Sequence, residues 1–336
     1  MTESLALRKA ARSGRTVAIV LALILIALIV VLTAIGIRSR ISPEMEVGLV
    51  PEASEVLAAV AEPLDSAVVS WTPTEVAEGT LFRVAITPET GTVASAEGAF
   101  AGESLHFRPE DGGILAALAA APIDERGDVE LRVEIQYESA TAEIRFLQVP
   151  VVAGDYRMER LSVAPEFGGP QPPEIQRRIN DEFARAMQVS QASHATPRMW
   201  TRGFVPPRQT RITSGFGHGR VFNDEVQSRH MGTDFGGTVG APVLAPARGR
   251  VALVDAFYLG GNVIYLDHGD GLVTAYLHLS EQQVTEGEVV ETGQVIGRVG
   301  ATGRVTGPHL HWIVRYGVIT VDGMSLLSLD SPAAPA

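Results

Sequence analysis

The feature that most constrains this chain is an uncharged run of 21 residues near its N-terminus, residues 17–37. As a helix rising about 1.5 Å per residue, the run would be roughly 30 Å long, the thickness of a bilayer's hydrocarbon core. A buried helix of a soluble domain would show a polar face, and this run has none. The apolar region of a cleavable signal peptide would be shorter and would be followed by a cleavage site of small residues. This run is instead followed by basic residues, in the sequence Gly-Ile-Arg-Ser-Arg. We therefore predict an uncleaved transmembrane helix over residues 17–37.

Charged residues on both sides of the run set its direction in the membrane. Four basic residues and one acidic residue precede it, and Arg38 and Arg40 follow it closely. The positive-inside rule then makes residues 1–16 a cytoplasmic tail. We expect a single-pass protein of the cell inner (cytoplasmic) membrane, with everything after Arg40 in the periplasm or outside the cell.

The composition excludes several classes of protein. The chain of 336 residues contains no cysteine, which rules out a disulfide framework, a cysteine nucleophile, an iron–sulfur cluster and a zinc finger. Its formal net charge is −12 although the segment before the apolar run is basic, so nucleic acid is not expected as a partner. The length allows about two folded domains and their connecting segments.

Short β-type runs dominate the first folded region. Residues 38–66 are rich in Pro, Ala and Glu and are expected to form a linker. Beyond them, alternating apolar and polar residues predict strands at residues 81–86, 104–109, 129–137 and 142–149. These runs, separated by turn-forming residues, predict a β-sandwich-like domain over residues 67–165. Its one histidine, His106, is expected to be a solvated strand residue without a chemical role.

An amphipathic segment follows the predicted sandwich. Apolar residues at helical spacing predict a helix over residues 174–193, within a helical connector that spans residues 166–204. The apolar positions are Ile175, Ile179, Phe183, Ala186 and Met187. The apolar positions span only about three and a half turns, too few for a zipper, so packing against one neighbour is expected. The last domain is expected over residues 205–330, with a tail at residues 331–336, and the folded chain is expected to be mainly β.

The candidate chemistry is concentrated in the last domain, which holds six of the chain's eight histidines. If residues 308–316 form a strand, Leu310 and Trp312 face an apolar side, and His309 and His311 face the other. Two imidazoles side by side on one face suit a metal ion and a neighbouring catalytic group.

The same alternation predicts the position of another histidine. In residues 274–279, Thr274, Tyr276 and His278 should share one face of a strand, while Ala275 takes the other face with the leucines. The pattern therefore again directs a histidine to a polar face.

A third element combines a histidine with a carboxylate. His230 and Asp234 would lie roughly 13 Å apart in an extended chain, too far to share one ion. Gly232 and the β-branched Thr233 disfavour a helix that would bring them together. A bend at Gly232 would close the gap, because glycine is the residue that such a bend needs.

Three motifs in this order resemble those of the LytM or lysostaphin-type zinc metallopeptidases, the M23 peptidase family. They are HxGxD at residues 230–234, YxHL at residues 276–279 and TGPHLHW at residues 306–312. The resemblance covers about residues 205–330 and implies an antiparallel β domain of LytM type. It also implies hydrolysis of peptide bonds in the stem or cross-link peptides of peptidoglycan, for cell-wall remodelling or division.

The resemblance implies a role for each residue of these motifs. His230, Asp234 and His311 would bind Zn2+, and two nitrogens with one carboxylate would leave a fourth position open for water, as in catalytic zinc sites. His278 and His309 would be catalytic residues that orient or deprotonate the water and stabilise charge. No HExxH occurs, which excludes the mechanism in which a glutamate of that motif is the base.

The resemblance further implies partners and a means of control. Expected partners are peptidoglycan peptides, the cytoplasmic membrane through the N-terminal helix, and cell-wall or division proteins. In some family members an upstream segment covers the zinc. Here the helix at residues 174–193 or the β-sandwich-like domain is the hypothesised cover.

Two alternative functions follow from the sequence. Some family members are inactive, so a LytM-type factor that binds the wall and activates another hydrolase is the alternative to an enzyme. Residues 284–300 also resemble the hairpin of biotinyl or lipoyl carrier domains. These domains need a modifiable lysine, and the only lysine of the chain is Lys9, which excludes the carrier function.

The remaining polar residues near glycines are given structural roles. Asn223 and Asp224 are expected in a loop at the rim of the cleft. Four residues are expected to form turns rather than to bind metal: His218, His268, Asp267 and Asp270.

Overall fold

The computed structural model of this chain describes residues 65–224 and 226–329. The predicted cytoplasmic tail, the predicted transmembrane helix, nearly all of the predicted linker and the predicted C-terminal tail lie outside these residues. Within the described ranges, no helix combines the length and the apolar character needed to cross a bilayer.

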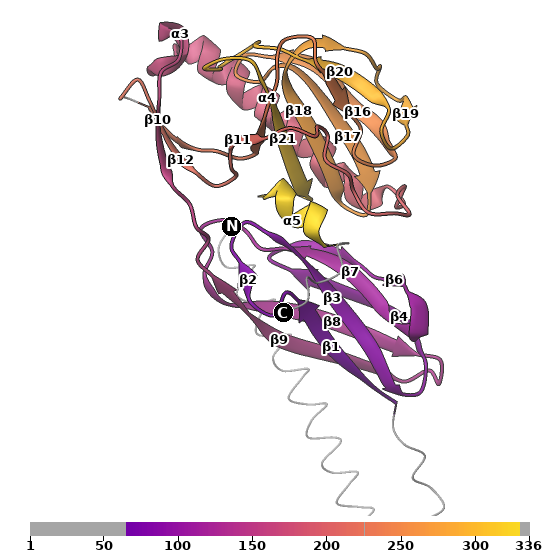
Figure 1. Cartoon of the computed structure of the whole chain (residues 1–336). Coiled ribbons are helices and arrows are strands. Elements are labelled where there is room, and N and C mark those ends of the chain that lie inside the picture. The colour runs from indigo at the N-terminus through magenta and orange to yellow at the C-terminus, as the bar shows by residue number, and fades with distance from the viewer. Residues whose placement is uncertain (1–64, 225, 330–336) are drawn as a thin grey trace, which may run out of the picture. The chain divides into compact units, whose positions relative to one another are not determined.

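The first described region consists of two sheets, antiparallel except where β2 pairs in parallel with β9 (Figure 1). Its alternating sequence explains the arrangement, because every second residue of a strand such as β8 is buried from Leu131 to Tyr137. Phe82 and Phe100 meet edge to face in the core, with ring centroids 5.0 Å apart. One sheet has the order β1 (Ser66–Thr72), β3 (Leu81–Thr90), β7 (Leu115–Ala120), β6 (Arg108–Pro109). The other has the order β2 (Val76–Ala77), β9 (Ala142–Val152), β8 (Gly127–Tyr137), β4 (Val93–Phe100), β5 (Glu103–His106).

The segment after β9 does not continue the sandwich. Residues 153–165 were assigned to the sandwich from sequence, but β10 (Met158–Leu161) pairs in parallel with β12 (Gly219–Phe222). β12 also pairs with β13 (Val226–Arg229), which completes a separate three-stranded sheet. The chain therefore contributes a strand to the C-terminal region before it reaches the helical connector.

The C-terminal region is built on a ten-stranded, antiparallel sheet. Its central strands carry the histidine motifs, because β21 (His309–Tyr316) pairs with β14 (Thr233–Gly236) on one side and with β18 (Leu272–Gln282) on the other. The path then runs through β17 (Gly261–Gly269) and β16 (Gly249–Phe257) to β19 (Val289–Val290). The remaining strands are β11 (Ile212–Ser214), β15 (Pro242–Leu244), β20 (Val295–Val299) and β22 (Ile319–Val321).

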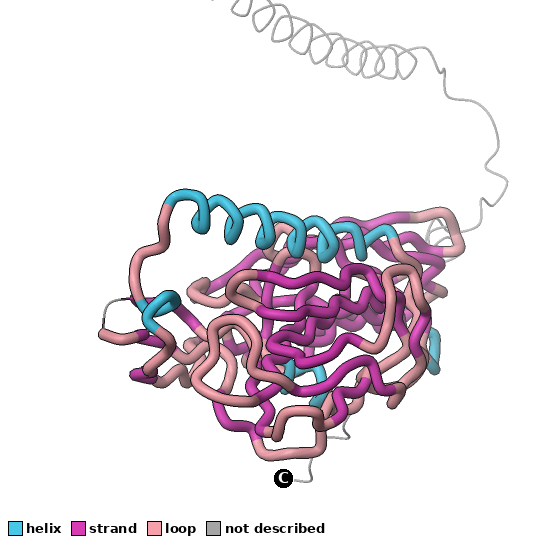
Figure 2. The backbone as a smooth tube through the Cα atoms, turned by 90° about the horizontal axis from the view of Figure 1, so that it is seen from above, coloured by secondary structure: helices cyan, strands magenta, loops and turns pink. Residues whose placement is uncertain are grey.

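The long helix α4 (Pro173–Ala192) lies along one face of this sheet, as Figure 2 shows. Ala186 is buried with Val263, Tyr265 and Ile313, so the helix packs on one neighbour as expected. Phe183 departs from the prediction, since 58% of it is exposed. It lies instead near the Arg315 guanidinium, which is 5.9 Å from its ring centroid. The other short helices are α3 (Pro165–Gly168), η1 (Asp111–Gly113) and η2 (Ser193–Ala195).

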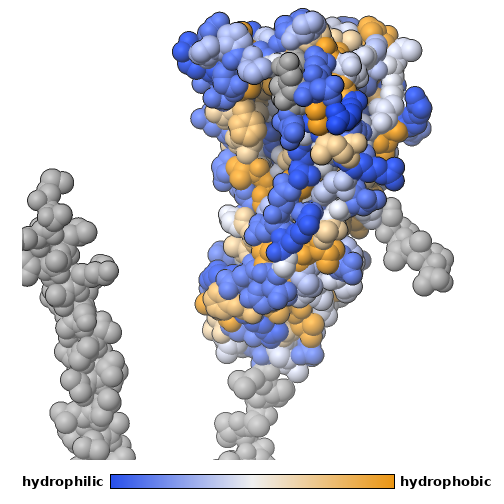
Figure 3. Space-filling view, turned by 90° about the vertical axis from the view of Figure 1, so that its left-hand side faces the viewer, coloured by the Kyte–Doolittle hydropathy of each residue, from blue (hydrophilic) through white to orange (hydrophobic). Residues whose placement is uncertain are grey.

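Hydrogen bonds also join the sandwich to the C-terminal region. The last helix, α5 (Gly323–Ser328), lies against β3. The Asp322 amide donates to the Gly79 carbonyl oxygen over 2.7 Å, and the Leu81 amide donates to the Ser325 hydroxyl over 2.9 Å. The surface seen in Figure 3 interleaves hydrophobic residues with hydrophilic ones.

His106 is not the solvated residue that the sequence predicts. Its side chain is partly buried, and its Nε2 shares a hydrogen bond of 2.8 Å with Nδ1 of His194. The Nε2 of His194 lies 2.7 Å from the Glu103 carboxylate. Burial lowers the pKa of His106. The three residues form a hydrogen-bonded chain between β5 and η2, so His106 has a structural role.

Candidate metal centre

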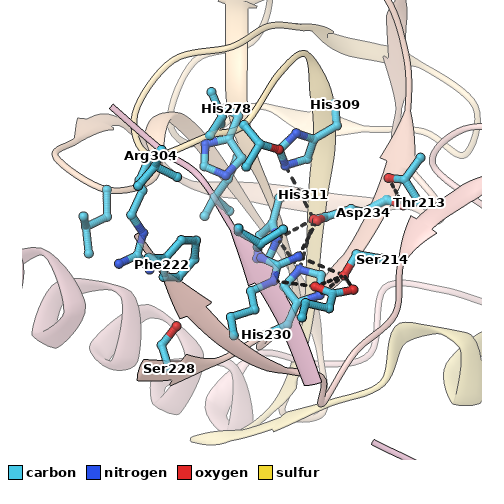
Figure 4. A pocket seen from close by; sticks show the side chains of 18 of the residues that line it. Thr213, Ser214, Phe222, Ser228, His230, Asp234, His278, Arg304, His309 and His311 are labelled. Carbon is cyan, nitrogen blue, oxygen red and sulfur yellow. Dashed lines mark hydrogen bonds and ion pairs between the residues drawn. The ribbon is translucent and has the colours of Figure 1, made fainter. Parts of the chain in front are cut away.

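A cavity of about 480 Å³ lies where β14, β18 and β21 meet the small sheet (Figure 4). All five residues that the sequence selects for chemistry line it: His230, Asp234, His278, His309 and His311. Of the two hypothesised covers, α4 contributes no described residue to its lining, and the predicted domain over residues 67–165 contributes only residues that follow its two sheets. These are Glu159 and Leu161 of β10, together with Val163.

His230, Asp234 and His311 form a compact group that could hold a metal ion. The His230 Nε2 lies 3.0 Å from the Asp234 Oδ1 and 2.9 Å from the His311 Nδ1. The His311 Nδ1 lies 2.8 Å from the same carboxylate oxygen. All three residues are buried. Two ring nitrogens and one carboxylate oxygen therefore converge on one point.

Backbone pairing positions two members of this group. In the ladder between β14 and β21, Asp234 is opposite His311, and Gly236 is opposite His309. Residues opposite each other in adjacent strands have neighbouring side chains, which explains how the HxGxD and HxH motifs meet. The alternation predicted for β21 is confirmed, because Leu310 and Trp312 belong to the main core while His309 and His311 line the cavity.

Gly232 brings His230 to the group for a reason different from the predicted one. Its backbone is not in the left-handed region, so no special bend demands glycine. A Cβ at this position would lie 2.7 Å from the His311 ring and 2.7 Å from the Trp312 carbonyl oxygen. Glycine is needed because the chain passes directly against a neighbouring candidate ligand.

Outer contacts fix the orientation of the candidate ligands. The His230 Nδ1 donates to the Gly215 carbonyl oxygen over 2.6 Å, which leaves its Nε2 unprotonated toward the group. The Arg220 guanidinium donates to the Asp234 Oδ2 over 2.7 Å, which leaves Oδ1 toward the two histidines. Arg220 is itself held by Glu159 and by the Ser214 hydroxyl. This arrangement is typical of metal sites, whose ligands are usually oriented by further hydrogen bonds.

The protonation states also suit a cation. Burial by itself would raise the pKa of Asp234, but the neighbouring His230 and His311 hold that pKa well below its ordinary value. Burial lowers the pKa of His311 to about 4, although the Asp234 carboxylate opposes that change. A buried carboxylate that stays ionised beside a histidine that stays neutral is the donor set that a divalent metal needs.

Two further histidines lie beside this group without joining it. The ring centroid of His278 is 5.0 Å from that of His309 and 5.7 Å from that of His311. The His278 Nδ1 donates to the Thr302 carbonyl oxygen, and the His309 Nδ1 donates to the Gly307 carbonyl oxygen, each over 2.8 Å. A neutral imidazole that donates through Nδ1 has an unprotonated Nε2. Both rings can therefore accept a proton at Nε2.

The predicted alternation along β18 fails at His278. Thr274 and Tyr276 are fully buried and line no part of the cavity, and Tyr276 belongs to the main core. Between Tyr276 and Leu279 the ladder with β17 shifts by one residue, and His278 has a φ of 65°. This β-bulge turns the His278 side chain to the cavity, where simple alternation would have buried it. A left-handed histidine is uncommon, and such strain is concentrated at functional sites.

Sequence reasoning missed the charged residues that surround the candidate ligands. Arg220 and Glu159 come from strands outside the motifs, and Glu159 is 75 residues from Asp234. Arg304 lies two residues before the motif at residues 306–312 and belongs to none of the three motifs. Nothing in the spacing of these residues signals that they meet.

The residues assigned to turns have more varied roles. His268 is wholly buried in β17, where its Nδ1 donates to the Arg248 carbonyl oxygen and its Nε2 accepts from the Thr274 hydroxyl. Asp267 also lies in β17 and accepts hydrogen bonds from Ser193 and Thr196. These two turn predictions are wrong, because buried polar partners come from distant segments.

The other loop predictions fit the structure better. Asp270 has a φ of 51° in the turn between β17 and β18, and it binds Arg108 of the sandwich. His218 precedes β12 and shares a hydrogen bond of 2.9 Å with Glu159. Asn223 and Asp224 form the turn between β12 and β13, but neither lines the cavity.

Comparisons with known proteins agree with this geometry. A model of peptidase family M23 matches residues 228–323. The chain is 39% identical over 136 residues to the peptidoglycan DD-endopeptidase ShyB of Vibrio cholerae, covering 40% of this chain and 32% of the relative. It is 46% identical over 105 residues to ShyA of the same organism, another peptidoglycan DD-endopeptidase, covering 30% of this chain and 24% of the relative. The matched segment thus spans a third or less of these relatives.

A solved structure shares the fold over a longer part of the chain. It is a crystal structure of a protein from Pseudomonas aeruginosa provisionally assigned as an M23 peptidase, with a TM-score of 0.56 and 24% identity. The likeness covers 76% of this chain and 96% of that chain. At this identity it shows the fold alone. The match extends well beyond the C-terminal region, so the fold that recurs includes residues upstream of it.

Proposed function

We propose that the protein is a zinc-dependent endopeptidase of peptidase family M23 that hydrolyses peptide bonds in peptidoglycan stem or cross-link peptides. Support for the family comes from the match of its model to residues 228–323. Support for this substrate comes from relatives named as peptidoglycan DD-endopeptidases. The proposal extends their activity to a chain that matches them over one domain.

The observation that carries the proposal is the convergence of five side chains in one cavity. Two histidine nitrogens and one carboxylate oxygen form the candidate ligand set, with donor atoms within 4.8 Å of one another. In a tetrahedral site with bonds of about 2.0–2.1 Å, such donors lie roughly 3.3 Å apart, so small adjustments admit zinc. Three protein ligands leave the fourth position for water, which distinguishes catalytic from structural zinc sites.

The residues around this set can carry the remaining chemistry. Zinc, when bound, would supply a Lewis acid that makes water nucleophilic near neutral pH. Burial and the neighbouring His311 and His309 hold the pKa of His278 well below its ordinary value, so the ring is neutral and its unprotonated Nε2 can accept a hydrogen bond that orients the attacking water. Once its Nε2 has accepted a proton, His309 is placed to stabilise charge on the reacting carbonyl or to donate to the leaving amine, since this nitrogen lies 3.6 Å from the Asp234 Oδ1.

The cellular location forms part of the proposal. The apolar run at residues 17–37 and the basic residues before it support an anchor in the cytoplasmic membrane that places the catalytic domain on the side of the wall. Membrane fractionation tests the anchor. Release of the protein by salt or carbonate washing, without detergent, would contradict it.

The function is tested by digestion of purified peptidoglycan with the full-length protein in detergent. We expect release of cut stem peptides that stops with a chelator, returns with zinc, and is lost in His309→Ala. His106→Gln, which changes a histidine at the sandwich contact, is the matched control and should retain activity. Absence of cleavage by a folded, zinc-loaded protein would contradict the proposal and favour the alternative of an inactive factor that activates another hydrolase.

A further inference from the structure

The proposed mechanism assigns no role to Arg304, a cationic residue that lines the cavity. Its side chain lines the cavity beside His278, and Figure 4 shows it next to Phe222, on the side away from Thr213 and Ser214. Its guanidinium carbon lies 4.3 Å from the centroid of the Phe222 ring. Among the described residues, no carboxylate lies within ion-pair distance of this guanidinium. An arginine has five N–H donors, and here none of them has a side-chain acceptor in the described part of the chain.

The carboxylates nearby are already occupied. Asp234 and Glu159, which also line the cavity, both accept hydrogen bonds from Arg220. Glu159 additionally binds His218. A rearrangement that paired Arg304 with either acid would therefore take a partner from the candidate metal centre.

The surroundings of Arg304 disfavour its charge. Partial burial lowers its pKa, and the positive charge of Arg220 lowers it further. The guanidinium remains protonated at any physiological pH, because its ordinary pKa is far above that range. An anion bound beside it would compensate both the lost hydration and the repulsion.

The backbone holds Arg304 in place before any ligand arrives. The Arg304 amide donates to the Leu259 carbonyl oxygen over 2.8 Å. Gly303 has a φ of 73°, and a side chain there would collide with the backbone of residues 259–261. Together with the stack on Phe222, these contacts fix the base of the side chain. A preorganised arginine of this kind binds planar anions such as carboxylates through two parallel hydrogen bonds.

We propose that Arg304 is a substrate-binding residue that recognises a free carboxylate of the peptide in the cavity. The inference rests on the proposed function, since it takes the substrate to be a stem peptide. Such a peptide offers carboxylates from two sources, its C-terminal α-carboxylate and a side-chain carboxylate. Arg304 thereby gives the cavity a preference for peptides that are acidic at one defined position.

The test measures kcat/KM of the full-length, zinc-loaded protein on synthetic cross-linked stem peptides in three forms. One form has all carboxylates free, one is amidated only at its C-terminus, and one only at its side-chain carboxylate. Loss of a charge-assisted hydrogen bond is expected to lower kcat/KM by roughly ten- to a hundredfold for one of the two amidated forms, mainly through KM. The form that is affected identifies the carboxylate.

Two variants connect this preference to Arg304. In Arg304→Gln the ratio of kcat/KM between the free and the amidated peptide should fall toward one. Arg250→Gln removes the same charge from an exposed position of β16 and should keep the wild-type ratio. Thermal melting and bound zinc are measured for each protein, so that a misfolded variant is recognised. An unchanged ratio in folded Arg304→Gln would overturn the proposal, as would equal rates for all three peptides with the wild type.

A binding measurement separates this inference from the proposed function. Calorimetry with the same three peptides is carried out on wild type, and on His309→Ala where hydrolysis would interfere. Weaker binding of one amidated form, without any hydrolysis by the wild type, would support the carboxylate site and contradict the peptidase activity. Equal affinity for all three forms would overturn the carboxylate site and leave the peptidase activity standing.

Discussion

The buried His268 should make the stability of this protein fall steeply in mild acid. The side chain has no exposed surface, and both ring nitrogens are hydrogen bonded. Burial lowers its pKa to about 4, against about 6.5 in an unfolded chain. The folded protein therefore keeps this ring neutral between these values, while the unfolded chain takes up a proton. Because the unfolded state then binds more protons, stability is fully present above pH 6.5 and is lost as the pH falls toward 4.

The size of the loss follows from the two pKa values. Linkage gives a decrease in the free energy of unfolding of about 2 kcal/mol at pH 5 and about 3 kcal/mol at pH 4, relative to pH 8. Other groups titrate in the same range, so the contribution of His268 must be isolated by comparison with a variant that cannot be protonated there. In His268→Asn the amide nitrogen can still donate toward the Arg248 carbonyl oxygen, while the pH-dependent term is removed.

The assay is urea unfolding of both proteins at pH 8, 7, 6 and 5. The variant is expected to be less stable at pH 8, because the smaller side chain leaves a cavity. The difference in free energy of unfolding between wild type and variant should decrease by about 2 kcal/mol between pH 8 and pH 5, because only the wild type carries the cost of keeping His268 neutral. A difference that stays constant over this range would refute the reasoning and show that His268 is not held neutral by burial.

Three further predictions concern the candidate metal centre and the contact between the two folded regions. Gly232→Ala should lower zinc affinity by roughly ten- to a hundredfold, because the Cβ of the new alanine would displace the His311 ring. The affinity is measured by competition with a chelator. An unchanged affinity would show that the ring can move aside. Arg220→Lys should weaken zinc binding about tenfold in the same titration. The reason is that an ammonium group cannot make all the hydrogen bonds by which the guanidinium holds Asp234, Glu159 and Ser214 together. Unchanged affinity would contradict this orienting role. Arg108→Ala should lower the free energy of unfolding, measured in urea, by about 1 kcal/mol. The substitution breaks a bidentate ion pair with Asp270 that is partly screened by solvent. An unchanged free energy of unfolding would mean that solvent fully replaces the pair.

The sequence was most informative where a periodic pattern coincided with a buried strand. The alternation along residues 308–316 correctly separates Leu310 and Trp312 from His309 and His311, because β21 is central and paired on both sides. The same rule failed on the adjacent strand β18, at His278. A β-bulge changes the parity of every residue beyond it, and its presence depends on the register with β17, which no local pattern encodes.

Residues that orient the candidate ligands were harder to find than the ligands themselves. His230 and Asp234 stand out through their spacing, but the Arg220 that fixes the Asp234 carboxylate belongs to no motif. Its position depends on the parallel pairing of β10 with β12, whose paired residues are 61 positions apart in the sequence. Such contacts between distant segments are set by tertiary packing. The burial of His268 beneath Arg248 escaped prediction for the same reason.

The hydrogen bonds between the sandwich and the C-terminal region bear on how the protein unfolds. Glu103 is buried, and its carboxylate accepts hydrogen bonds from the Val318 amide and His194 across this contact. Separating the two regions would leave that carboxylate, the Asp322 amide and the Leu81 amide without these partners. Each region thus completes the polar groups of the other, so the pair should melt in one calorimetric transition. By this reasoning the C-terminal region is one part of a larger cooperative folding unit, and a cut placed at residue 228, where the family match begins, would divide that unit.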